Sequence, residues 1–133
     1  VFYLLGGSDT GAGTMAPSLD LSIGFKYKFD ISDNSNTGHP LKFSIVQDGS
    51  HNGGSEFTTN VTTSGTAGSS GAFVQLEITP ETMGASTSSN AGVPVLYPYC
   101  PNHSGMGGNA VYSLFASGSG SGTQFDQFLL IGA

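Results

Sequence analysis

Charge is scarce in this chain. Only 9% of its 133 residues are charged, and the formal net charge at pH 7 is −6. The basic residues are three lysines, Lys26, Lys28 and Lys42. Proteins that bind DNA or RNA neutralise several phosphates with clustered lysine and arginine side chains, and so few lysines cannot do this. The composition therefore predicts no nucleic-acid partner.

Long apolar runs, a basic leader and paired cysteines are also missing. A membrane-spanning helix needs about 20 consecutive apolar residues, and no run approaches that length. The apolar start at residues 1–5 is too short for a signal peptide and has no basic residue. The single cysteine cannot form an internal disulfide. We expect no membrane span, and the sparse charge favours an extracellular, cell-surface or virion location, with the periplasm as a further option.

Glycine is abundant, with 21 residues, and apolar and polar residues alternate in several short segments. Alternation with period two is typical of half-buried β-strands, and glycine, serine and threonine are typical of the turns between them. The pattern predicts an all-β protein, a Greek-key β-sandwich of about seven or eight strands with no helix and with a loop over residues 80–94. The expected strands inside the domain are 19–23, 25–29, 41–45, 57–61, 72–78, 95–99 and 110–116.

Both ends of the chain combine an apolar segment with a Gly/Ser-rich one. Residues 1–5 precede the Gly-rich segment 6–14, and residues 124–131 follow the Gly/Ser segment 117–123. Such segments behave as flexible linkers. The sequence thus divides into an N-terminal strand with its linker (1–14), a central domain (15–116) and a C-terminal linker with its strand (117–133). The terminal strands either close their own sandwich at its edges or pair with a neighbouring chain, which would make them sites of protein–protein assembly.

Candidate metal ligands are concentrated in residues 97–108. This segment contains the only cysteine, Cys100, together with His103 and Met106. Thiolate, imidazole and thioether are soft ligands, which select copper over harder divalent ions. A blue-copper centre needs one Cys, two His and a weak axial Met, and His39, just before an apolar strand, is the best candidate for the second His. We predict a site for one copper ion at these four residues.

Other interpretations of the same residues stay open. The 97–108 segment could simply pack against the end of a metal-free sandwich. Alternatively, His51, in the motif Asp48-x-x-His51-x-x-x-x-Glu56, could join His39 in a harder zinc site built from histidines and carboxylates. Catalysis is less well supported, because the sequence has no nucleophile elbow and no pair of carboxylates, and a Cys–His pair beside a methionine is better explained by metal ligation. We therefore expect that the protein is not an enzyme.

The residues around these ligands follow a longer motif, Tyr97-x-Tyr99-Cys100-x-x-His103-x-x-Met106. With a histidine upstream before an apolar strand, this motif resembles the cupredoxin family, and the spacing between His103 and Met106 is like that of amicyanin-type members. The resemblance covers residues 17–116 and implies a Greek-key sandwich with one type 1 copper ion. It implies that His39, Cys100 and His103 are equatorial ligands and that Met106 is axial. It also implies electron transfer to a redox partner protein through an exposed edge of His103.

The chain departs from the cupredoxin pattern directly after the first histidine. Typical members have an asparagine there, whose side chain ties the two ligand loops together, whereas this chain has Pro40. Other residues must therefore connect the loops.

Several further segments are similar to cupredoxin-like modules in structural proteins of marine bacteriophages and in large surface proteins of marine bacteria. In those proteins the module is a building block. This similarity implies an alternative function, a decoration or fibre subunit of a phage particle or an extracellular filament, in which the metal site is structural or empty. The segments are Tyr27-x-Phe29-Asp30, Gly38-His39-Pro40-Leu41-x-Phe43-Ser44, Asp48-Gly49-Ser50-His51 and Gly68-x-x-Gly71-Ala72.

Overall fold

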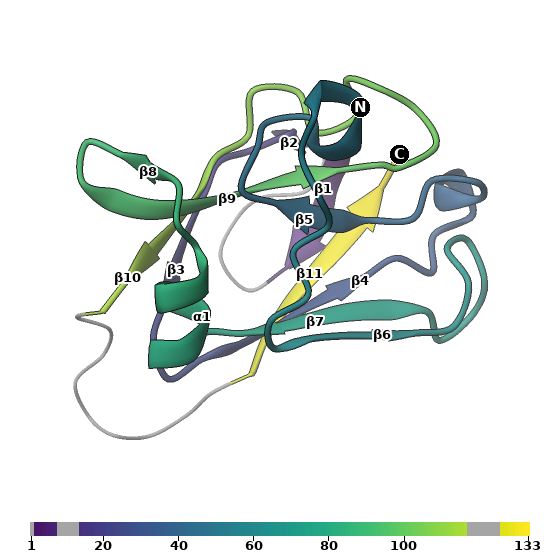
Figure 1. Cartoon of the computed structure of the whole chain (residues 1–133). Coiled ribbons are helices and arrows are strands. Elements are labelled where there is room, and N and C mark those ends of the chain that lie inside the picture. Colours follow the sequence, from purple (N-terminus) through teal and green to yellow (C-terminus); the bar gives the residue numbers. More distant parts are fainter. Residues whose placement is uncertain (1, 8–13, 117–125) are drawn as a thin grey trace.

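The computed structural model of the chain describes residues 2–7, 14–116 and 126–133, and this part is mostly β (Figure 1). Two mixed sheets form it, and they do not close into a barrel. The first sheet has six strands in the order β2-β1-β11-β4-β7-β6. Their bounds are Tyr3–Gly7 for β1, Thr14–Met15 for β2, Lys26–Asp30 for β4, Val61–Ser64 for β6, Phe73–Glu77 for β7 and Asp126–Gly132 for β11.

The second sheet has five strands, with β3, β10, β9 and β5 in that order and β8 paired to β9. Their bounds are Leu19–Ser22 for β3, Lys42–Ser44 for β5, Ser89–Asn90 for β8, Val93–Tyr99 for β9 and Tyr112–Phe115 for β10. β3 and β10 run parallel, whereas β9 is antiparallel to both β10 and β5. The all-β prediction is thus confirmed, while the Greek-key connection order stays a prediction.

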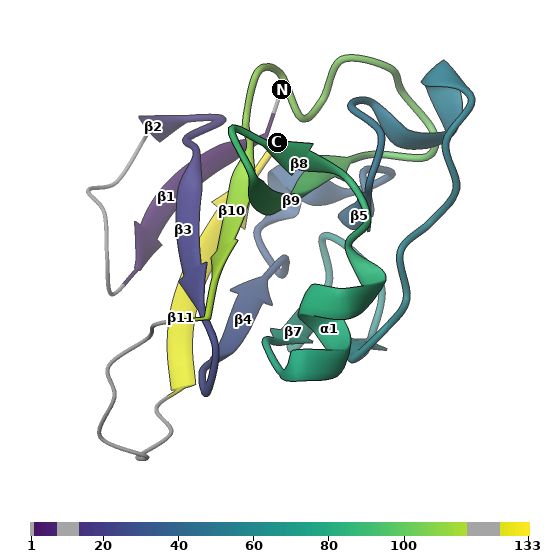
Figure 2. The same cartoon turned by 60° about the vertical axis from the view of Figure 1, so that its left-hand side comes forward.

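Both terminal strands pair within their own chain. β1 is antiparallel to β11, and β11 runs parallel to β4, with Asp126 opposite Lys26 and Leu130 opposite Asp30 (Figure 2). The structure therefore follows the alternative in which the terminal strands complete their own sheet, although both β1 and β11 lie inside that sheet rather than at its edges. The predicted linker 117–123 and most of the linker 6–14 lie outside the described residues.

The hydrophobic core lies between the two sheets. β4 and β7 bury every second side chain, as the alternation predicts, and Phe29 on β4 is completely buried. Its ring centroid lies 5.3 Å from that of Phe43 on β5 and 5.9 Å from that of Tyr112 on β10, so aromatic side chains join the two sheets. Burial raises the pKa of the Tyr112 phenol well above its usual value.

The loop predicted over residues 80–94 is wrong. It contains the helix α1 (Pro80–Ala85) and the strand β8. Thr79 caps α1 by accepting a hydrogen bond from the backbone of Thr82, whose side chain in turn accepts from the backbone of Thr79, and Pro80 occupies a first-turn position where its missing N–H costs nothing. A helix of six residues is too short to show a helical period, so only its capping residues could have revealed it.

The strand predicted at 57–61 is also displaced. Phe57 forms only an isolated bridge to Phe43, and the strand of this region is β6, which begins at Val61 and extends into residues assigned to a loop. The side chains of β6 are mostly exposed and do not alternate with buried ones, so period two gave no signal for them.

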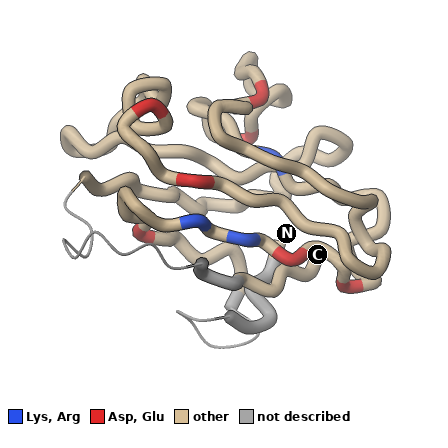
Figure 3. The backbone as a smooth tube through the Cα atoms, turned by 90° about the horizontal axis from the view of Figure 1, so that it is seen from below, with Lys and Arg blue, Asp and Glu red and all other residues tan. Residues whose placement is uncertain are grey.

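Charged residues are spread thinly over the described chain (Figure 3). Two of the three lysines lie on β4 and the third on β5, where Lys42 forms an ion pair of 3.0 Å with Glu56. No helix of the described residues is long and apolar enough to cross a membrane.

Candidate metal centre

The first two candidate ligands come from the ligand loop, residues 100–111, which connects β9 to β10. Cys100 directly follows β9 and has no exposed surface. The chain then turns so tightly that Cys100 and His103 face each other in an isolated antiparallel bridge. Pro101 and Asn102 form this turn. The backbone thus places an imidazole beside a buried thiol within four residues.

The third candidate, His39, comes from the connection between the 3-10 helix η1 (Asn34–Asn36) and β5. Asp33 caps η1 by accepting hydrogen bonds from the hydroxyl and the amide of Ser35, which hold the pKa of Asp33 below its usual value. After η1, the amide of His39 donates to the carbonyl of Asn36 at 2.7 Å. A short, capped segment therefore holds the backbone that carries His39.

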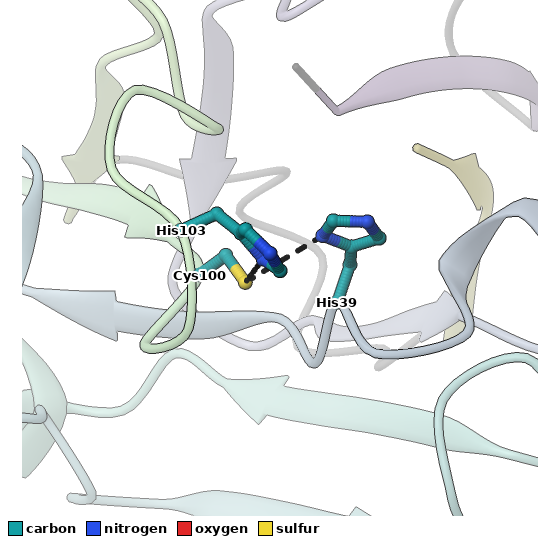
Figure 4. Close-up of side chains that lie close together, drawn as sticks. All are labelled: His39, Cys100 and His103. Carbon is teal, nitrogen blue, oxygen red and sulfur yellow. Dashed lines mark hydrogen bonds between the residues drawn. The ribbon is translucent and has the colours of Figure 1, made fainter.

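These three side chains converge at one point (Figure 4). The Cys100 sulfur lies 3.9 Å from Nδ1 of His39 and 3.9 Å from Nδ1 of His103. The two imidazole rings have centroids 4.5 Å apart and planes inclined by 45°, and one ligand atom from each of the three residues lies within 4.8 Å of the others. A single ion can contact the sulfur and each nitrogen, because a metal–sulfur and a metal–nitrogen bond together span roughly 4.3 Å.

Met106 is the fourth residue of the predicted set. It belongs to the ligand loop, its side chain is buried, and it lies close to the other three residues. Its carbonyl accepts a hydrogen bond of 2.7 Å from the amide of Phe2. One thiol, two imidazoles and one thioether are a soft donor set that fits copper. The residues that the sequence singled out thus gather in the fold, and together they could hold a metal ion.

Exposure differs among the candidate ligands in a way that matters for chemistry. Cys100 and Met106 are buried, His39 is half-buried and His103 is exposed. Burial excludes water from the sulfur atoms and thereby protects a thiolate bond. His103 is the most exposed residue of the cluster.

Asn102 connects the two loops that carry the ligands. Its side-chain amide donates to the carbonyl of Gly38 at 3.2 Å, next to His39. The chain therefore has an asparagine tie, but this tie starts from the ligand loop, whereas the typical cupredoxin residue would stand at Pro40. A residue other than the one at position 40 thus connects the two loops. No local sequence pattern predicts this bond, because it joins residues 64 positions apart.

A second set of supports comes from residues 47–51, which include the start of the 3-10 helix η2 (Gly49–Asn52). Three side chains of this segment bond to the backbone of the ligand loop. Since a carbonyl only accepts, His51 Nε2 carries the hydrogen in its bond. The bonds are His51 Nε2 with the Cys100 carbonyl at 2.8 Å, the Gly105 amide with Asp48 Oδ1 at 2.8 Å, and Gln47 Nε2 with the Gly108 carbonyl at 3.1 Å.

The zinc alternative with His51 and Glu56 does not agree with this arrangement. His51 is engaged with the Cys100 backbone, and Glu56 pairs with Lys42. In the part of the chain that the structure describes, His39 gathers with Cys100 and His103 into a candidate metal group that does not include His51. His51 instead hydrogen-bonds the backbone of the ligand loop.

Comparison with known proteins identified no relative of this chain. No family model, no curated protein and no solved structure matches the chain. The function of the site must therefore be argued from its own geometry.

We expect Asn102→Ala to weaken metal binding by about 10- to 100-fold, because residues that orient metal ligands typically contribute this much. The metal-free protein should lose only about 1 kcal/mol of stability, as for a single exposed hydrogen bond. Affinity would be measured by competition with a chromophoric chelator. Asn109→Ala, which removes another exposed asparagine of the same loop, is the matched control. Equal affinities of the two variants would show that the tie does not position the ligands.

Proposed function

We propose that the chain is a cupredoxin-like domain that binds one copper ion at His39, Cys100, His103 and Met106. The proposal rests on one observation above all: the Cys100 sulfur lies 3.9 Å from Nδ1 of two histidines that belong to different loops. A metal-free packing loop would have no need to direct two imidazole nitrogens at one buried sulfur. The thioether of the neighbouring Met106 favours copper, since soft ligands of this kind select it.

Copper held by such residues supplies reversible one-electron exchange. The protein's own part is to bury the sulfur, to keep the ligands in place in both oxidation states, and to present the exposed ring of His103 to a partner. We accordingly propose a non-catalytic protein whose partner is a redox protein that docks over His103. An extracellular, cell-surface, virion or periplasmic location agrees with its composition.

A structural role is the second candidate. It is favoured by β6, an edge strand that pairs with β7 on one side and contains neither charge nor proline in the segment Val61–Ser64. Such edges readily accept a strand from another chain. In a decoration, fibre or filament subunit, a bound ion would act as a staple, because a metal that binds only the folded state stabilises it by mass action.

The two candidates are separated by adding Cu²⁺ to the metal-free protein and recording metal content and the visible spectrum. We expect one copper per chain and an intense thiolate-to-copper band. Tight binding of one ion without this band, combined with concentration-dependent assembly, would favour the structural role. A colourless protein that retains no copper after desalting would contradict the proposed copper site. The same metal analysis on protein from its native source would identify the ion in use.

A further inference from the structure

The two ends of the described chain reach the two segments that carry the metal ligands. At the N-terminal end, Phe2 immediately precedes β1, and its amide donates to the Met106 carbonyl at 2.7 Å. The Phe2 ring is 5% exposed and lines a small apolar pocket together with Gly107 of the ligand loop and Ile131 of β11. The start of the chain therefore supports the part of the ligand loop that carries Met106.

The C-terminal end supports His39 in a similar way. The Asn36 side chain donates to the carbonyl of Ile131 on β11 at 2.7 Å, and the amide of Ala133 donates to the Ser35 hydroxyl at 2.9 Å. The backbone carbonyl of Asn36 also accepts a hydrogen bond from the amide of His39, at 2.7 Å. One residue thus connects β11 to the backbone of a candidate ligand.

Asn36 is a destabilising choice for a buried position. It has no exposed surface, and its Oδ1 atom lacks a hydrogen-bond partner among the described residues. A buried oxygen without a partner destabilises the fold, and such violations are expected where a residue serves a site rather than the core. In this buried position the Asn36 side chain donates its hydrogen bond to the β11 backbone.

We propose that docking of the terminal strands β1 and β11 is energetically coupled to metal binding, with Asn36 as the residue that couples β11 to His39. This inference rests on the metal site proposed above. When β11 is docked, Asn36 holds η1 and His39 where the Cys100 sulfur can share an ion with them. Coupling is reciprocal, so an ion that fixes His39 also fixes η1 and strengthens the attachment of β11. The attachment of both terminal strands, β1 and β11, thus becomes stronger when the site holds an ion.

Hydrogen exchange of the full chain tests the coupling. Amides of β11 and of Phe2 would be compared without metal and with saturating Zn²⁺, which binds thiolate and imidazole but has no redox chemistry. We expect exchange at these amides to slow by roughly tenfold on loading, within the range usual for coupled sites. Strand β7 serves as the internal reference. It lies in the same sheet, but its backbone pairs with β4 and β6 and not with the ligand loop or η1. It should slow much less.

The variant Asn36→Ala provides the second readout, with Asn34→Ala, an exposed residue of the same 3-10 helix, as its control. In Asn36→Ala at saturating Zn²⁺, β11 should no longer gain protection, whereas Asn34→Ala should behave as the native protein. If the native protein binds metal but β11 exchanges at an unchanged rate, the coupling is wrong and the metal site stands. If metal analysis finds no bound ion, both proposals fail. Should Asn36→Ala not fold, the native comparison alone decides.

Discussion

Cys100→Ser should abolish the thiolate-to-copper band and weaken copper binding by more than about 100-fold. Loss of a residue that only supports a ligand weakens binding by up to about 100-fold, and loss of a ligand should cost more. The Cys100 sulfur lies 3.9 Å from Nδ1 of both histidines, and a serine hydroxyl is a harder ligand that stays protonated at neutral pH. The fold should survive, because the two side chains have nearly the same shape and Cys100 forms no disulfide. Titration with Cu²⁺, followed by absorbance and metal analysis, measures both effects.

Ala110→Ser is a suitable control for this variant. Ala110 is also small and buried, at 2% exposure, and lies in the ligand loop, but it has no atom that could bind a metal. The variant Ala110→Ser introduces the same hydroxyl in a comparable environment and keeps the Cys100 thiol, so the visible band should persist. A band that survived in Cys100→Ser would show that the sulfur is not a ligand, and the geometry around Cys100 would then need a different explanation.

Gly107→Ala should destabilise the metal-free protein by about 3 kcal/mol, the upper part of the range for overpacking a close-packed site. A Cβ atom at this position would clash with the carbonyl oxygen of Pro98 on β9, and backbone atoms cannot rotate away as a flexible side chain does. Gly107 follows Met106, so the displaced backbone would also move that candidate ligand. Chemical denaturation of the metal-free variant measures the loss of stability.

Gly84→Ala controls for the loss of glycine itself. Gly84 lies in α1, and a Cβ atom there would meet nothing within 4 Å. Because alanine favours a helix over glycine by up to about 1 kcal/mol, this variant should be slightly more stable than the native protein. If Gly107→Ala were as stable as Gly84→Ala, the ligand loop would have to be able to shift away from β9 at no cost, and its positioning of Met106 would be loose.

The sequence predicted the features that depend on local pattern. Leu19, Tyr27, Val74 and Leu76 alternate with polar residues, and each is buried in a strand of the expected class. The candidate site was predictable for a different reason. Cysteine, histidine and methionine are rare in this chain, so their closeness in residues 100–106 was itself a signal of shared chemistry.

The missing features depend on contacts between distant segments or on elements too short to have a period. The bond of Asn102 to Gly38 and that of His51 to Cys100 exist only because separate loops meet at one end of the sheets. Asn36 looked like an ordinary residue of a polar turn, yet it is buried by the strand at the far end of the chain. No local rule connects such residues, since their partners are fixed by the tertiary fold.

The position of β11 has a consequence for the order of folding. β11 pairs with β4 in parallel, Asp126 opposite Lys26 and Leu129 opposite Phe29, so each contact spans 126 − 26 = 100 residues. During synthesis, β4 and β1 emerge long before the strand that separates them. Closing so long a loop is slow, and until then the edge of β4 is open to incorrect partners. The sheet therefore reaches its final strand order only after β11 has been synthesised, and a nascent chain is open to aggregation at β4 until then.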